Sequence, residues 1–84
     1  MRIRSEDVYL ATRAALECAD RVGASSIMIP GMGTGIGGVS FEGAAESMIK
    51  AIEDFAPHPR SLKRIILCDL SDGMVNAWLN LMRR

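Results

Sequence analysis

The stretch that decides the fold of this chain is residues 26–41, which read SIMIPGMGTGIGGVSF. Its apolar start predicts a buried strand that stops at Pro30, because a proline nitrogen has no hydrogen to donate to a sheet. Five of the eight residues 31–38 are glycines, which leave the backbone free to turn with positive φ. A strand, a glycine-rich loop and then a helix form the arrangement in which backbone N–H groups and a helix N-terminus hold an anion. Residues 31–38, called the glycine loop below, are therefore the first candidate for a phosphate site.

Length and charge restrict the class of protein. With 84 residues the chain is at most one small domain, residues 1–84. It carries ten basic and ten acidic residues, and this balance argues against a nucleic-acid binder, which needs a basic face to neutralise phosphates. No apolar run is long enough to cross a membrane and no signal peptide fits the charged N-terminus. We therefore expect a cytoplasmic protein without a membrane partner.

Apolar residues recur at helical spacing in three segments and form continuous runs in two. Ser5 and Ser40 are the expected N-caps of the first two helices, and Gly23 is placed to end the first. A helix between two strands makes a βαβ unit, so the strands should be parallel with a right-handed crossover. The fold class is therefore α/β, in the order αβαβα. The predicted helices cover residues 5–21, 41–56 and 74–82, and the second strand covers residues 65–68.

Both predicted strands are apolar on both faces, which is typical of parallel strands inside a larger sheet covered by helices. Two such strands alone would leave two open edges. The sequence thus looks like the interior of an α/β domain with part of the sheet missing. We expect a homo-oligomer, or a second chain that supplies the missing half.

Several single residues have an ordinary structural interpretation. Cys18 and Cys68 lie fifty residues apart, without metal-ligand spacing, and are expected to be buried hydrophobes in a reducing compartment. His58 stands between two prolines and is expected in a solvated loop. Trp78 is expected to be a buried anchor of the last helix.

Two well-known phosphate motifs fit the glycine loop poorly. Gly33-x-Gly35-x-x-Gly38 has the spacing of the dinucleotide-binding fingerprint. In that fold, however, the helix opens within the glycines and an acidic residue follows about twenty residues later at the end of the next strand. Asp69 comes too late for this role. A P-loop is excluded because no Gly-Lys-Ser/Thr follows the loop.

A different family fits better. Residues 30–38, read PGMGTGIGG and followed by Glu42, Ala44 and Ala45, resemble the second ligand loop of macro domains, the ADP-ribose-binding modules. The alanine-rich helix before the loop, the strand that ends at Asp69 and the last helix also occur in the family's order. The resemblance covers nearly all of the chain and corresponds to the C-terminal half of a three-layer macro domain. It implies ADP-ribose or a related nucleotide diphosphate as the ligand.

The resemblance also implies which residues bind. In the family this loop surrounds the diphosphate and the distal ribose, so backbone N–H groups of the glycine loop would donate to phosphate oxygens. Asp69 is placed on the same rim, at the carboxyl end of the second strand, where α/β proteins bind ligands. The implied ligand-binding residues are Gly31, Gly33, Thr34, Gly35, Ile36, Gly37, Gly38 and Asp69. Two departures matter: residues 39–41 lack the family's usual proline, and the family's first half, which selects adenine, has no counterpart here.

Three functions follow from these observations. The leading one is an ADP-ribose- or phosphate-binding half of a macro domain, non-catalytic on its own and without a cofactor or metal. The first alternative is a structural or oligomerisation module with a vestigial ligand loop. The second is a hydrolase of ADP-ribose derivatives that another chain completes.

Overall fold

The chain folds in the order αβαβα, as the sequence predicts. The computed structural model describes residues 3–34, 37–57 and 59–83. Predicted and observed ends agree to within one or two residues, and the second strand begins one residue earlier than expected. The elements are α1 (Ser5–Arg21), β1 (Ser26–Ile29), α2 (Phe41–Phe55), β2 (Arg64–Leu67) and α3 (Asp72–Met82).

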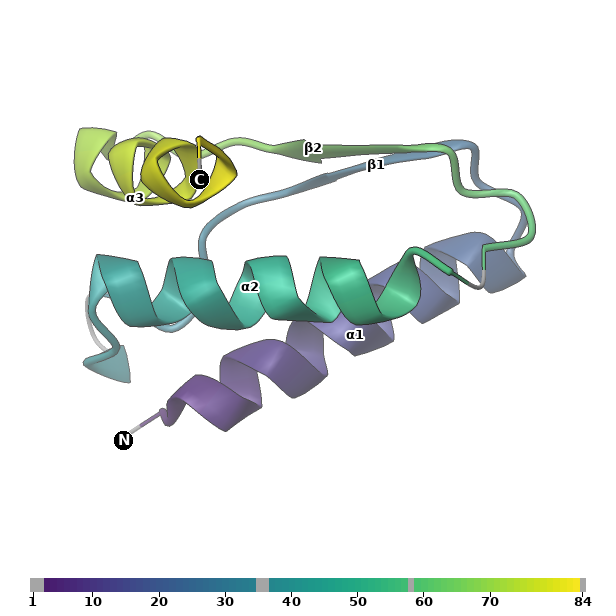
Figure 1. Cartoon of the computed structure of the whole chain (residues 1–84). Helices are drawn as coiled ribbons and strands as arrows, with labels where there is room; N and C mark the ends of the chain where they lie inside the picture. Colours follow the sequence, from purple (N-terminus) through teal and green to yellow (C-terminus); the bar gives the residue numbers. More distant parts are fainter. Residues whose placement is uncertain (1–2, 35–36, 58, 84) are drawn as a thin grey trace.

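The two strands form a parallel sheet in which Ser26 pairs with Arg64 and Ile29 with Leu67. Helices α1 and α2 lie on one face of this sheet, and α3 continues from the carboxyl end of β2 (Figure 1). No described helix covers the opposite face, where Met28 is 63% exposed. Both strands are therefore buried on one face only, although their sequences are apolar on both faces. Burial is one-sided because the two strands have helices on one face only.

The first helix begins and ends through backbone contacts. Arg4 is its N-cap, since the Arg4 carbonyl accepts the Val8 N–H, so the expectation that Ser5 caps the helix is wrong by one residue. The Asp7 carboxylate accepts the Arg4 N–H at 3.0 Å and completes the cap. At the other end Gly23 has φ +86°, and the Ala24 N–H donates to the Ala19 carbonyl. This is a Schellman motif, which confirms the predicted stop at Gly23.

The second helix starts at the predicted residue. Ser40 is the N-cap, and its hydroxyl oxygen accepts the Gly43 N–H at 3.0 Å. The third helix is preceded by Ser71 at the N-cap position, and its first turn carries Asp72, where the helix dipole favours negative charge. His58 lies outside the described residues.

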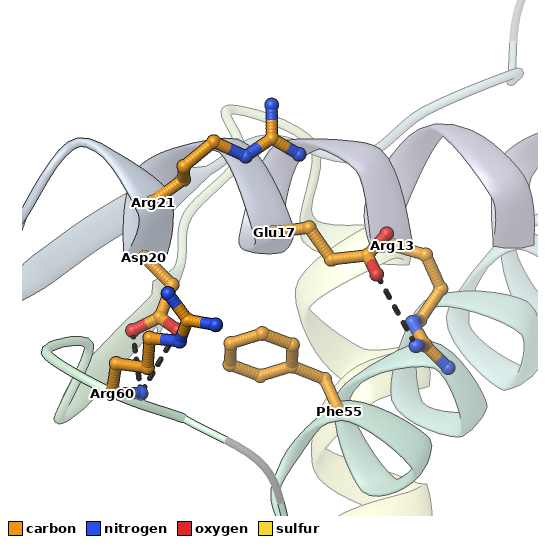
Figure 2. Close-up of a pocket in the computed structure, with 6 residues that line it drawn as sticks. All are labelled: Arg13, Glu17, Asp20, Arg21, Phe55 and Arg60. Carbon is orange, nitrogen blue, oxygen red and sulfur yellow. Dashed lines mark hydrogen bonds and ion pairs between the residues drawn. The ribbon is translucent and has the colours of Figure 1, made fainter.

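Asp20, near the end of α1, holds the segment that leads into β2. Its side chain is only 8% exposed and accepts three consecutive backbone N–H groups, from Arg60 at 2.9 Å, Ser61 at 2.7 Å and Leu62 at 2.8 Å. The Ser61 hydroxyl donates to the carbonyl of Ala24 at 2.9 Å. Figure 2 shows the Asp20 carboxylate facing the backbone nitrogen of Arg60. We call this group of contacts the Asp20 clamp.

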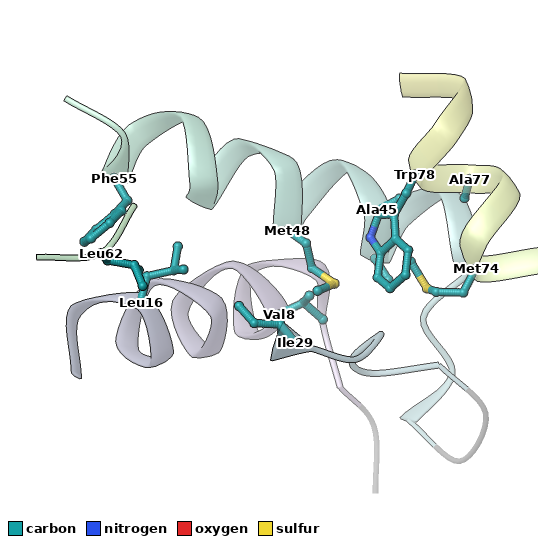
Figure 3. Packing of buried hydrophobic residues seen from close by; sticks show 11 residues of the cluster. Val8, Leu16, Ile29, Ala45, Met48, Phe55, Leu62, Met74, Ala77 and Trp78 are labelled. Carbon is teal, nitrogen blue, oxygen red and sulfur yellow. The ribbon is translucent and has the colours of Figure 1, made fainter. Parts of the chain in front are cut away.

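The core lies between the sheet and the helices (Figure 3). Small residues of α2, such as the fully buried Ala44 and Ala45, let the helix pack closely. Met48 and Met74 fill the space between them and the sheet, and Trp78 is 2% exposed, which confirms its predicted burial. The buried hydrophobic residues are Val8, Leu16, Ile29, Ala44, Ala45, Met48, Ala51, Phe55, Leu62, Met74, Ala77 and Trp78.

Two sequence-based expectations about burial are wrong. Cys18 and Cys68 are exposed thiols. Cys18 lies on α1 away from the buried stripe that contains Leu16, and Cys68 follows β2 on the uncovered face of the sheet, because side chains alternate along a strand.

Candidate functional site

The glycine loop leaves the carboxyl end of β1 beside the carboxyl end of β2. The Asp69 carboxylate, just after β2, accepts the Gly31 N–H at 3.3 Å through Oδ1 and the Ser71 N–H at 3.1 Å through Oδ2. A Cβ on Gly31 would lie 2.7 Å from Met74 Sδ, so only a glycine fits between the loop and α3 without a shift. Asp69 therefore fixes the first residue of the loop and the start of α3 together.

The loop turns back on itself through two residues with positive φ. Gly33 has φ +79° and Gly38 has φ +81°, a region that favours glycine. The Val39 N–H donates to the Gly33 carbonyl at 2.9 Å and closes the turn. A Cβ on Gly33 would lie 2.8 Å from Val8 Cγ2, whereas a Cβ on Gly38 would meet no atom within 4 Å. Gly33 thus faces the protein, and Gly38 faces open space.

The far side of the loop brings two helix N-termini together. The Ile3 N–H donates to the Gly37 carbonyl at 3.0 Å, which places the start of α1 against the loop. A Cβ on Gly43 would lie 3.1 Å from Ser40 Oγ and 3.5 Å from Ser5 Oγ, so the first turn of α2 adjoins that of α1. Between them is an open cleft of about 560 Å³. Its walls are Ile3, Arg4, Ser5, Gly38, Val39 and Ser40.

The electrostatics of this cleft favour an anion. The N–H groups at the start of both helices, those of Ser5, Glu6, Phe41 and Glu42, have no acceptor among the described residues. Two aligned helix dipoles add partial positive charge at the same place. Arg4 stands at the rim with its side chain 73% exposed and paired with Glu6 at 2.6 Å. The cleft therefore offers backbone donors, while the Arg4 guanidinium is paired with Glu6 and the first helical turns also carry the carboxylates of Asp7 and Glu42.

The structure brings most of the predicted site residues into one region. Gly31, Gly33, Thr34, Gly37 and Gly38 all lie in the loop that follows β1, and Asp69 contacts its first residue. Gly35 and Ile36 lie outside the described residues. Sequence reasoning missed the start of α1, because residues 3–5 approach the loop only in the folded chain.

A second pocket, of about 310 Å³, lies at the other end of the strands beside the Asp20 clamp (Figure 2). The clamp lowers the pKa of Asp20 to about 2, chiefly through the N–H groups of Leu62, Ser61 and Arg60, against the opposing effect of burial. Arg13 donates to the Tyr9 hydroxyl at 3.3 Å and pairs with Glu17 at 3.6 Å. These contacts join residues of the chain to one another, so we interpret this pocket as part of the structural framework. The only sign of this pocket in the sequence is a polar residue on an otherwise apolar stripe of the helix.

Tyr9 links the first two helices near this pocket. Its hydroxyl donates to the Asp54 carboxylate at 2.5 Å, and this bond is the main cause of the lowered pKa of Asp54. The same hydroxyl accepts from Arg13 and raises the pKa of the guanidinium. In the described part of the chain, no group of three His, Cys, Asp or Glu side chains is arranged to hold a metal ion. Nor does any described helix have the length and apolarity needed to span a bilayer.

Comparison with known proteins identifies the family of the chain. Residues 1–48 match the family model of the Macro domain. An uncharacterized protein of Aquifex aeolicus is 49% identical over 73 residues, 87% of this chain and 43% of the relative. One from Pyrobaculum aerophilum is 34% identical over 79 residues, 94% of this chain and 43% of the relative. One from Mycobacterium tuberculosis is 33% identical over 73 residues, 87% of this chain and 20% of the relative. The chain thus spans less than half the length of these relatives, and it belongs to the Macro domain family.

Proposed function

We propose that this chain binds the diphosphate of ADP-ribose, or of a related nucleotide, through the glycine loop and the two helix N-termini beside it. The observation that carries the proposal is the cleft at Gly38, where the loop and the starts of α1 and α2 meet. Membership of the Macro domain family supports ADP-ribose as the ligand class. The proposed contacts are made by Gly33, Thr34, Gly35, Ile36, Gly37 and Gly38.

We assign Gly31 and Asp69 a supporting part in this site. The Gly31 N–H is already bonded to Asp69, so it is not free to donate to a phosphate in this state. Asp69 holds the loop against β2 and α3 and so sets the position of the remaining N–H groups. The chain alone is proposed to be non-catalytic, and hydrolysis of ADP-ribose derivatives would need residues from another chain.

The expected affinity is low. Each backbone donor or helix dipole at an exposed site contributes about 1 kcal/mol or less. A few such contacts give a dissociation constant on the order of 1 mM, or about −4 kcal/mol. Adenine discrimination needs a buried polar partner and a stacking surface, and the walls of the cleft supply neither. ADP-ribose, ADP and pyrophosphate should therefore bind with similar constants.

Calorimetric titration of the chain with these three ligands tests the proposal, and Gly38 provides a matched pair of variants. Asn and Asp both tolerate positive φ and are almost the same size. Gly38→Asp adds a negative charge to the cleft and should weaken binding of all three ligands at least tenfold, an order-of-magnitude expectation for two like charges in contact near a protein surface. Gly38→Asn, which adds the same bulk to the cleft without the charge, should weaken binding much less than Gly38→Asp.

Two results would contradict this assignment. Equal pyrophosphate binding by the Gly38→Asp and Gly38→Asn variants would place the anion elsewhere. Micromolar binding with a strong preference for ADP-ribose over ADP would show that an adenine-selective wall is present, which an oligomer would have to provide.

A further inference from the structure

The first turn of α3 packs against both ends of the segment that carries the glycine loop. At the entrance of the loop, a Cβ on Gly31 would lie 2.7 Å from Met74 Sδ of α3. Beyond its exit, a Cβ on Gly73 of α3 would lie 2.6 Å from Cε2 of Phe41. Figure 1 shows α3 over the half of α2 that begins at Phe41. Two neighbouring residues of α3 thus contact the first residue of the loop and a residue ten positions further along the chain.

Gly73 is required by packing and not by backbone conformation. It is the second residue of α3 and is not among the described glycines with positive φ, and alanine is the better helix former. Three atoms of the Phe41 ring, Cε2, Cδ2 and Cζ, lie between 2.6 and 3.2 Å from the position of a Cβ on Gly73. Any side chain at this position would therefore displace the ring.

The Phe41 ring is attached to the part of α2 that forms the cleft. Phe41 is the first residue of α2 and follows the N-cap Ser40, and its ring packs against the hydrophobic core. Ser40 is one wall of the cleft. The Phe41 N–H is one of the helix donors that have no acceptor among the described residues. A displaced ring therefore shifts the turn that carries this wall and this donor.

The other end of the loop is held by the same turn of α3. The Gly31 N–H donates to Asp69, whose second carboxylate oxygen accepts the Ser71 N–H at the start of α3. Met74, fully buried, fills the space beside Gly31. The first turn of α3 therefore fixes the separation between the entrance of the loop and the start of α2.

We propose that Gly73 and Phe41 are positioning residues of the ligand site, and that their contact sets where the start of α2 lies relative to the glycine loop. This inference rests on the proposed function for the ligand, a diphosphate. The contact itself is present without a ligand. By linkage, a diphosphate that binds best to this arrangement also stabilises the packing of α3 against α2.

Titration with pyrophosphate, followed through the amide resonances of the chain by NMR, tests the role of Gly73. Gly73→Ala should raise the dissociation constant about fivefold, within the range seen when packed side chains couple two sites. If Gly73 served only α3 itself, alanine would favour the helix and leave the affinity unchanged. Asn76→Ala is the matched control, because it also puts alanine into α3 but at an exposed position. It should keep the constant within about twofold.

A double-mutant cycle tests whether the effect passes through the ring. Phe41→Ala removes every ring atom that a Cβ at position 73 would meet. In the Phe41→Ala background, Gly73→Ala should therefore change the dissociation constant by less than about twofold, as for substitutions that share no remaining contact. A fivefold loss in both backgrounds would overturn the role of Phe41.

A further variant does not add bulk to the interface of the helices. Phe41→Leu keeps an apolar side chain but removes the ring, so it loosens the contact with α3 and should also weaken pyrophosphate binding. It decides the matter if Gly73→Ala does not fold. Unchanged affinity in folded Phe41→Leu would overturn the proposal.

Spectra without ligand separate this inference from the proposed function. Gly73→Ala should shift the amide resonances of Ser40 and Gly38, both in the walls of the cleft, whereas Asn76→Ala should not. If the unmodified chain did not bind pyrophosphate, the proposed function would be wrong, and these shifts would still support the positioning of the cleft by α3. Unchanged resonances of Ser40 and Gly38 in Gly73→Ala would overturn the positioning role, whatever the chain binds.

Discussion

The two ends of the sheet are built in opposite ways. At the amino ends of the strands, the Asp20 clamp saturates one buried carboxylate with N–H groups of Arg60, Ser61 and Leu62. At the carboxyl ends, the glycine loop is held by single hydrogen bonds at Gly31, Gly33 and Gly37, and the N–H groups of the adjoining helices have no acceptor among the described residues. At the amino ends the buried Asp20 carboxylate has its acceptor sites filled, whereas at the carboxyl ends the helix N-termini keep donors without an acceptor among the described residues.

This difference distinguishes a structural site from the proposed binding site. Both ends gather charged or polar groups beside a pocket. The two ends differ in their hydrogen bonds, because a buried group that is already paired has no donor or acceptor left for a ligand. The following predictions test whether the two ends divide stability and binding in this way.

The largest effect is expected from Asp20→Asn. The amide cannot accept three N–H groups with a full negative charge, and its own NH₂ would face donors. We expect the melting temperature to fall by about 20 °C, a large change for a domain of this size. Differential scanning calorimetry measures it.

The matched control for this change is Glu17→Gln, which removes a charge from the same helix but leaves the clamp intact. It should change the melting temperature little, because Glu17 is half exposed and its ion pair with Arg13 is long, at 3.6 Å. Pyrophosphate binding by folded Asp20→Asn should be unchanged. If Asp20→Asn melted like the unmodified chain, the amino end of the sheet would not be the stabilising one.

A smaller effect is expected from Gly33→Ala compared with Gly38→Ala. Both glycines have φ near +80°, so both substitutions carry the backbone penalty of about 1 kcal/mol. Only Gly33 would also bring a Cβ to 2.8 Å from Val8. Gly33→Ala should therefore lower the free energy of unfolding by about 3 kcal/mol in total, measured by urea denaturation. Equal losses in the two variants would mean that the loop does not pack against α1.

The smallest effect is expected from pH. The clamp lowers the pKa of Asp20 from 3.8 to about 2, so the unfolded chain takes up its proton first as the pH falls. The contribution of Asp20 to stability is thus present above about pH 4 and is lost as the pH falls toward 2. Urea denaturation between these values should show a steeper decline for the unmodified chain than for Asp20→Asn. Parallel curves would show that the carboxylate is not held by the clamp.

The sequence predicted the elements well because their signals are local. Ser40 caps the second helix and Gly23 ends the first through contacts within a few residues, and both are confirmed. The Macro domain family was also recognisable from the glycine loop, whose residue types are set by backbone torsion. The predictions that failed concern contacts between residues far apart in the sequence. Cys68 was expected in the core, but the helices cover only the other face of the sheet.

The site was predictable in part for the same reason. The loop itself could be found from its glycines, but the contact between Ile3 and Gly37 joins segments 34 residues apart and leaves no local pattern. Asp20 is a similar case, since its partners lie 40–42 residues away. A polar residue on an apolar helix stripe indicates that a partner exists, but not which one.

The long sequence separation of the Asp20 clamp has a consequence for folding kinetics. The clamp can form only after α1 and the segment before β2 have come into contact. Closing a loop of 40 residues costs conformational entropy before these hydrogen bonds can form. The turn between Gly33 and Val39, by contrast, can form early because it spans six residues. Contacts that form after the transition state slow unfolding without speeding folding. We therefore expect the clamp to form late in folding. Its loss should shorten the lifetime of the native state while the rate of folding stays nearly the same.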